Sequence, residues 1–210
     1  MRKRYFFTIC AVSLAVVSSF IIVFDALAHL LYLSNEECDT LVVDVYGYLD
    51  NHILQEGVCY KRGLSVWEFR SLGRVKAHRV IIVTHFFSSP KSLGLGVSDD
   101  MSIVFLLLHP VTTFFVVKGV LDNGEIRLAV APSIKHISSP MNNKTIFLVT
   151  CFRPEIAEFA NAFLDLGARA VIVTRTAEMT LKDAASTVYT LLKQQNLEEL
   201  CGSPYIYCYR

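Results

Sequence analysis

Two short runs of apolar, mostly β-branched residues each end beside a side chain that can take part in covalent or acid–base chemistry. Residues 80–84 are followed by His85, and residues 145–150 are followed by Cys151. Continuous apolar runs of this length are typical of parallel strands that are buried on both faces. Open α/β sheets place their sites beyond the carboxyl ends of the strands. If these two strands are neighbours, His85 and Cys151 therefore reach the same edge of the sheet.

The same pattern predicts five further strands and several turns. The strands are expected at residues 40–45, 103–108, 113–120, 126–130 and 170–174. Between two of them, Asp122-Asn123-Gly124 favours a β-hairpin turn, because asparagine and glycine tolerate positive φ. Residues 132–137 predict a short helical turn. Serine, proline and glycine give residues 86–101 the composition of a loop.

Three segments have the apolar period of an amphipathic helix. They are residues 65–75, a helix that begins near Pro154 and is ended by Gly167 as its C′ residue, and a helix that follows Thr180. Thr180 and Asp183 form a capping-box pattern at the start of the third helix. Strand and helix alternate from residue 145 onwards, which implies a right-handed parallel crossover. The fold class predicted is α/β, with a mainly parallel central sheet and a β-hairpin insertion.

The N-terminal segment has the pattern of a membrane anchor. Basic residues 2–4 precede an uncharged apolar stretch at 5–24, and a bilayer-spanning helix needs about 20 such residues. We therefore expect a signal anchor over residues 1–33 and an extracytoplasmic domain over residues 34–210, in a single-pass protein of the cell membrane. Ala26-Leu27-Ala28 resembles a cleavage site, so a removed signal peptide and a secreted protein form the first alternative. A buried soluble helix is the second.

Charge and cysteine content narrow the choice of partners. The net charge is +1, which gives no electrostatic reason to expect a nucleic acid. Export permits disulfides, and two local pairs are favoured, Cys38 with Cys59 and Cys201 with Cys208. Four cysteines allow three connectivities, and free buried thiols are the alternative. No spacing suits a zinc site, so we expect neither a metal nor a cofactor.

Cys151 is the candidate nucleophile because of where it lies. It stands between a strand and the helix expected from Pro154, whose first backbone amides would stabilise a thiolate and an oxyanion. Arg153 would add a positive charge nearby. His85 is the candidate acid–base group, although most of the six histidines are expected to be structural or solvated. The alternative for Cys151 is a small, buried apolar residue at a strand end.

The central and C-terminal parts of the chain resemble a known family. The run Ala160-Asn-Ala-Phe-Leu-Asp-Leu-Gly-Ala168 and the strand expected at 170–174 are similar to the CHAT/caspase-like cysteine peptidases. The resemblance covers roughly residues 78–195. It implies a three-layer sandwich with a histidine–cysteine dyad at the ends of consecutive core strands, here His85 and Cys151. Phe86 departs from the family, which has a glycine after the histidine so that backbone approaches the oxyanion.

These observations predict a membrane-anchored or secreted cysteine endopeptidase that acts on a polypeptide substrate. Arg175, after the strand at 170–174, is a candidate contact for an acidic substrate side chain, and Asp99 and Asp100 are candidates for a basic one. Each of the three could instead be a solvated surface charge. A catalytically inactive binding or assembly module is the alternative function, and Phe86 favours it. A thiol oxidoreductase is disfavoured, since Cys151 has no C-x-x-C partner.

The Asn143-Lys144-Thr145 tripeptide is an N-glycosylation sequon. A glycan there would be compatible with an exported domain, although such tripeptides are common by chance.

Overall fold

The computed structural model describes residues 37–49, 56–89, 92–98, 115–121, 124–176, 180–194 and 196–210. The signal anchor expected over residues 1–33 and the strand expected at 103–108 lie outside these ranges, as do Asp99 and Asp100. Among the described residues, none of the helices combines the length and the apolar character needed to cross a membrane.

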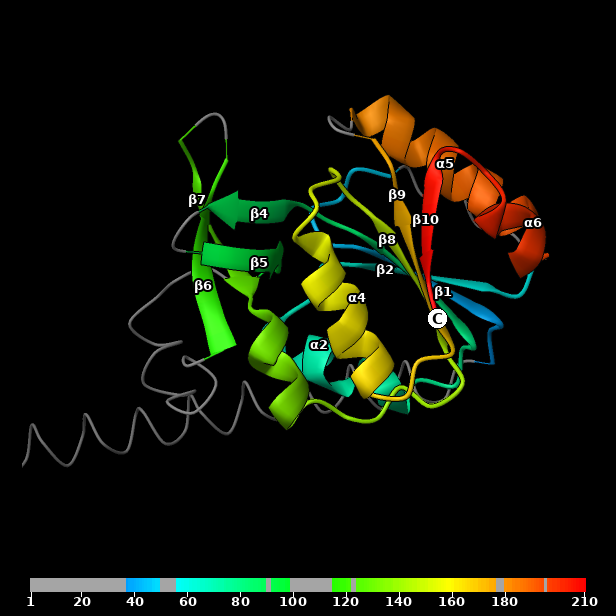
Figure 1. Ribbon diagram of the computed structural model, residues 1–210, viewed down its shortest axis with the longest axis horizontal. Helices are drawn as coiled ribbons and strands as arrows, with labels where there is room; N and C mark the ends of the chain where they lie inside the picture. Colours follow the sequence, from blue (N-terminus) through cyan, green and yellow to red (C-terminus); the bar gives the residue numbers. More distant parts are fainter. Residues whose placement is uncertain are drawn as a thin grey trace, which may run out of the picture.

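Within the described ranges the larger sheet has six strands, and it confirms the mainly parallel arrangement (Figure 1). In spatial order they are β2 (Val58–Arg62), β1 (Thr40–Asp44), β3 (Arg79–Val83), β8 (Thr145–Val149), β9 (Ala170–Thr174) and β10 (Ile206–Tyr209). Neighbours are parallel except β10, which pairs with β9 in the antiparallel sense. The four inner strands are buried almost throughout, as their apolar sequences require.

Helices cover both faces of this sheet (Figure 1). One face carries α2 (Val66–Ser71), which continues into the turn η2 (Leu72–Arg74), together with η4 (Pro132–Ile137) and α4 (Ile156–Asp165). The other face carries α5 (Leu181–Lys193), which leads to the short α6 (Leu197–Cys201). Alternate residues of β8 supply the two cores: Ile146 and Leu148 pack on the α4 side, and Phe147 and Val149 pack on the α5 side.

A second, antiparallel sheet lies beside the first (Figure 1). Its strands, in spatial order, are β4 (Phe86–Ser89), β5 (Ser92–Gly96), β7 (Ile126–Val130) and β6 (Val116–Val120). The predicted hairpin between β6 and β7 is confirmed, with Gly124 at a φ of 81° in its turn.

The prediction that residues 86–101 form a loop is wrong, because β4 and β5 occupy much of that segment. Their glycines are not turn residues. A Cβ atom on Gly94 would lie 2.6 Å from the Cβ atom of Ala129, and one on Gly96 would lie 2.2 Å from the Tyr46 hydroxyl oxygen. Both glycines are therefore required by close packing within a sheet, which composition does not distinguish from a loop.

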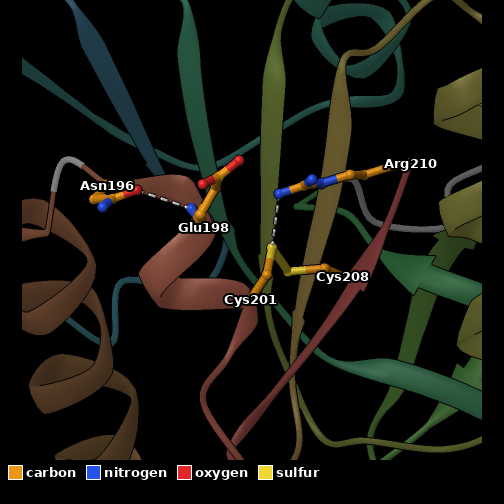
Figure 2. The surroundings of a disulfide bond; sticks show 5 residues. All are labelled: Asn196, Glu198, Cys201, Cys208 and Arg210. Atoms are coloured by element: carbon orange, nitrogen blue, oxygen red, sulfur yellow. Dashed lines mark hydrogen bonds between the residues drawn. A yellow bond between two sulfur atoms is a disulfide. The ribbon is translucent and has the colours of Figure 1, made fainter.

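Two disulfides join neighbouring elements in the local pairs that the sequence favoured. Cys38–Cys59 links the start of β1 to β2, across a sequence separation of 21 residues. Cys201–Cys208 links α6 to β10 across 7 residues (Figure 2). Figure 2 also shows the Asn196 side chain capping α6 through the Glu198 amide at 3.0 Å. The covalent links thus lie at the two edge strands of the larger sheet.

Removing the two disulfides separately should give unequal losses of stability. A disulfide stabilises a fold mainly by restricting the unfolded chain, and the longer loop is restricted more. We expect the Cys38→Ser/Cys59→Ser pair to lower the free energy of unfolding by about 3 kcal/mol and the Cys201→Ser/Cys208→Ser pair by about 2 kcal/mol. Urea unfolding of the two variants beside the wild-type chain measures both. A larger loss at the shorter loop would contradict this ranking.

Candidate functional site

The carboxyl ends of β1, β3 and β8 lie level with one another at one edge of the larger sheet. Asp44 pairs with Val83, and Val83 pairs with Val149. His85 lies two residues after Val83, and Cys151 lies two residues after Val149, so the two side chains occupy equivalent positions beyond neighbouring strands. Side chains two residues apart along a strand lie on the same face. Val83 and Val149 both pack on the α5 side, and His85 and Cys151 continue that face.

His85 and Cys151 line the same pocket. It has a volume of about 270 Å³ and lies between the ends of β3 and β8 and the first turns of α5. Its other lining residues are Tyr48, Val83, Thr84, Val149, Thr180 and Ala184. Cys151 is half-buried and is the free cysteine of the described part of the chain. The edge that the sequence predicted is thus a cavity with a thiol and an imidazole in its wall.

Tyr48 holds the imidazole of His85 from one side. Its hydroxyl forms a hydrogen bond with His85 Nε2. The rings of Tyr46 and Phe87 lie 5.2 and 6.1 Å from the imidazole, measured between centroids. When Nε2–H donates to the Tyr48 hydroxyl oxygen, a neutral imidazole carries its basic lone pair on Nδ1. The contacts therefore restrain the orientation of the imidazole ring.

Hydrogen bonds to Asp44 fix the conformation of the loop that carries Tyr48. Its buried carboxylate accepts the amide of Gly47 at 2.9 Å and the amide of Leu49 at 2.6 Å, and it also accepts the Tyr60 hydroxyl at 3.0 Å. A buried carboxylate with three donors is well satisfied, so the loop after β1 is fixed on both sides of Tyr48.

Burial raises the pKa of Tyr48 to about 12, and the negative charge of Asp44 adds to the rise. A smaller contribution in the same direction comes from Cys151. The Tyr48 hydroxyl therefore stays protonated and uncharged at neutral pH. Sequence reasoning missed this residue. Its signal was its place just after the strand predicted at 40–45, at the same carboxyl edge as His85 and Cys151.

The raised pKa of Tyr48 predicts a loss of stability at alkaline pH. The folded protein keeps the phenol proton up to about pH 12, whereas the unfolded chain loses it near pH 10. The stabilisation is complete below pH 10 and disappears as the pH rises through 12. Urea unfolding between pH 9 and 12 should show a smaller fall in Tyr48→Phe than in the wild-type protein. Burial also raises the pKa of Tyr46, but this residue is present in both proteins and does not affect the comparison. An equal fall in the two proteins would contradict the assignment.

The helix predicted to follow Cys151 is α4, which begins at Ile156 and has Glu155 as its N-cap residue. The Ile156 amide donates to the Arg153 carbonyl at 3.0 Å, and the Ala157 amide donates to the Pro154 carbonyl at 3.2 Å. Because a tight turn precedes the helix, these amides already have acceptors. These two amides are therefore not free to donate to a thiolate or an oxyanion.

The other predicted site residues lie away from the pocket or outside the described residues. Arg153 is exposed and donates to the Phe152 carbonyl at 3.0 Å. Arg175 lies over the ring of Tyr207 at 4.6 Å and donates to the Pro204 carbonyl at 3.3 Å. Neither arginine lines the pocket. Asp99 and Asp100 fall outside the described ranges.

Phe86 has a packing role that explains why a glycine does not follow His85. Its side chain is buried, and its ring meets the ring of Phe159 edge to face, with centroids 6.0 Å apart. Phe86 thereby joins the smaller sheet to α4. Replacing it by glycine would leave a cavity between these two elements.

The part of the chain that the structure describes contains no cluster of three His, Cys, Asp or Glu side chains suited to a metal ion. No protein-family model matches the chain, and no curated protein is significantly similar to it. The chemistry of the site therefore has to be inferred from its own residues.

Proposed function

We propose that this chain is a cysteine peptidase in which Cys151 is the nucleophile and His85 is the general acid and base. The observation that carries the proposal is the placement of both side chains, from adjacent parallel strands, in one pocket. Hydrolysis through a covalent intermediate requires at least a nucleophile and a base that face the same cavity. The resemblance to caspase-like peptidases supports the same pair, since that family has its dyad at the ends of consecutive core strands.

The reaction divides peptide hydrolysis into two steps. His85 takes the proton of the Cys151 thiol, and the sulfur forms a bond to the carbonyl carbon of the substrate. The carbon–nitrogen bond then breaks, His85 returns the proton to the leaving amine, and a thioester remains on Cys151. In the second step His85 takes a proton from water, whose oxygen attacks the thioester. The carbon–sulfur bond breaks, the new carboxyl group leaves, and Cys151 regains its proton.

Tyr48 is a positioning residue in this proposal. In the tautomer in which His85 Nε2–H donates to the Tyr48 hydroxyl oxygen, Nδ1 carries the lone pair that takes the thiol proton. The rings of Tyr46 and Phe87 restrict rotation of the imidazole. An orienting third group of this kind is a recurring feature of nucleophile–base pairs.

The two disulfides favour a compartment outside the cytosol. We propose that the domain is extracytoplasmic, held to the membrane by the segment at residues 1–33 or secreted after that segment is removed. Its fold is proposed to be the caspase-like three-layer sandwich, which the helices on both faces of the larger sheet support. Its partner is a polypeptide in either case.

The alternative is a catalytically inactive member of the same fold that binds a polypeptide. Phe86 favours it, because a buried phenylalanine stands where the family has a glycine next to its histidine. The two functions differ in one respect that can be measured, namely whether peptide bonds are broken.

Digestion of a mixed peptide library, followed by mass spectrometry, tests the proposal. Wild-type protein should generate new termini, and Cys151→Ala should generate none. Reaction in water enriched in ¹⁸O should place one heavy oxygen in each new carboxyl group, because water attacks the thioester. Library peptides that stay intact with wild-type protein, or that are cut equally by Cys151→Ala, would contradict a peptidase built on this dyad.

A further inference from the structure

We propose that the pocket beside His85 and Cys151 selects an apolar, uncharged side chain on the residue whose carbonyl is attacked. This inference rests on the proposed peptidase function and names its class of substrate. It differs from the expectation that Arg175 would receive an acidic side chain or that Asp99 and Asp100 would receive a basic one.

The described lining of the pocket is apolar apart from the reacting groups, the Tyr48 hydroxyl and two threonines. Its apolar lining groups are Val83 of β3, Val149 of β8, Ala184 of α5 and the ring of Tyr48. None of these described lining residues is charged. The hydroxyl of Thr180 is already engaged, since it donates to the Asp183 carboxylate at 2.6 Å and accepts the Asp183 amide at 3.2 Å.

The charged groups nearest in the chain face other surroundings. Arg153 turns back to the Phe152 carbonyl, and Arg175 stacks on Tyr207. Arg127 lines a neighbouring cavity that shares Tyr48 with the pocket, and its guanidinium forms an ion pair with Glu125 at 2.5 Å. A charged substrate side chain in the pocket would thus lose its water without a lysine, arginine, aspartate or glutamate among the described lining residues. Burying such a group is strongly unfavourable, whereas an apolar side chain gains from the transfer.

The size of the pocket fits one side chain. Sites for whole small molecules have volumes of about 300–1,000 Å³, and this pocket has about 270 Å³. Because Cys151 and His85 are part of its wall, an occupant sits directly beside the atoms that react. The pocket therefore sets the identity of the residue at the scissile bond rather than that of a more distant one.

Peptides that differ only at the residue before the cleaved bond test the inference. We expect kcat/KM for leucine or valine there to exceed that for aspartate or lysine by about 100-fold or more, in line with the discrimination that one pocket achieves. Ala184→Leu, which narrows the pocket from α5, should lower the preference for leucine over alanine about tenfold. Val120→Ala, an exposed position on β6, should leave the ranking unchanged.

The outcomes separate this inference from the function on which it rests. A preference for aspartate or lysine, with cleavage still lost in Cys151→Ala, would overturn the apolar pocket and leave the peptidase intact. Equal rates for all five residues would also overturn it. Peptides that are not cut at all would overturn both. The order of kcat/KM values among the five peptides is measured with wild-type protein. A folding defect in Ala184→Leu therefore does not affect this part of the test.

Discussion

His85→Ala should lower kcat for peptide hydrolysis by about 10²–10⁴-fold, because a general acid–base group contributes an acceleration of that size. Without the imidazole, no described group of the pocket takes the thiol proton or returns it to the leaving amine. The half-buried imidazole lies in a cavity wall, so its removal is expected to leave the core of the larger sheet intact. Steady-state kinetics on a peptide found in the library digestion measure the loss.

His136→Ala is the matched control for this substitution. His136 is an exposed histidine on η4, and it does not line the pocket. We expect this variant to retain the wild-type kcat. Similar losses in the two variants would show that His85 affects the rate through general stability and not through proton transfer.

Phe159→Ala should destabilise the fold strongly, with a loss of about 3–5 kcal/mol in the free energy of unfolding. Phe159 is 1% exposed in α4 and packs edge to face on Phe86. Truncation removes apolar contacts and leaves a cavity between α4, the larger sheet and the smaller sheet. Urea unfolding monitored by circular dichroism measures the change.

Val120→Ala provides the comparison for Phe159→Ala. Val120 lies on β6 and is 63% exposed, so truncating it should change the free energy of unfolding by no more than about 0.5 kcal/mol. Comparable losses at the two positions would contradict the assignment of Phe159 to the core that joins the two sheets.

Much of the larger sheet could be predicted because its inner strands are buried on both faces. The sequences of β3, β8 and β9 are nearly continuous apolar runs, and such runs are typical of parallel strands buried on both faces. The capping box at Thr180 marked the start of α5 for a similar reason, since two side chains there satisfy backbone amides reciprocally. These signals are local, and a single sequence carries them.

Strands β2, β10, β4 and β5 could not be predicted from the same signals. β2 and β10 are partly exposed and contain polar or aromatic residues, so neither has the apolar run of a buried strand. β4 and β5 have the composition of a loop because Gly94 and Gly96 resemble turn residues. The role of these glycines depends on contacts with Ala129 and Tyr46, which are distant in sequence.

The candidate site was predictable in part. His85 and Cys151 stand directly after buried strands, and the level ends of β3 and β8 bring them to one pocket. Tyr48 was missed because its contact with His85 spans 37 residues and depends on the loop that Asp44 folds. Arg175, proposed as a substrate contact, and Arg153, proposed as a charge beside the thiolate, have other partners and do not line the pocket.

The rate at which a peptide electrophile alkylates Cys151, in wild-type protein and in His85→Ala, tests the joint action of these two residues most directly. The probe carries leucine before its reactive carbon, and digestion with mass spectrometry identifies the modified cysteine. We predict one adduct, on Cys151, formed at least about tenfold more slowly at pH 7 in His85→Ala, because the imidazole takes the thiol proton. Equal rates in the two proteins, or an adduct elsewhere with Cys151 unmodified, would contradict a histidine–cysteine dyad.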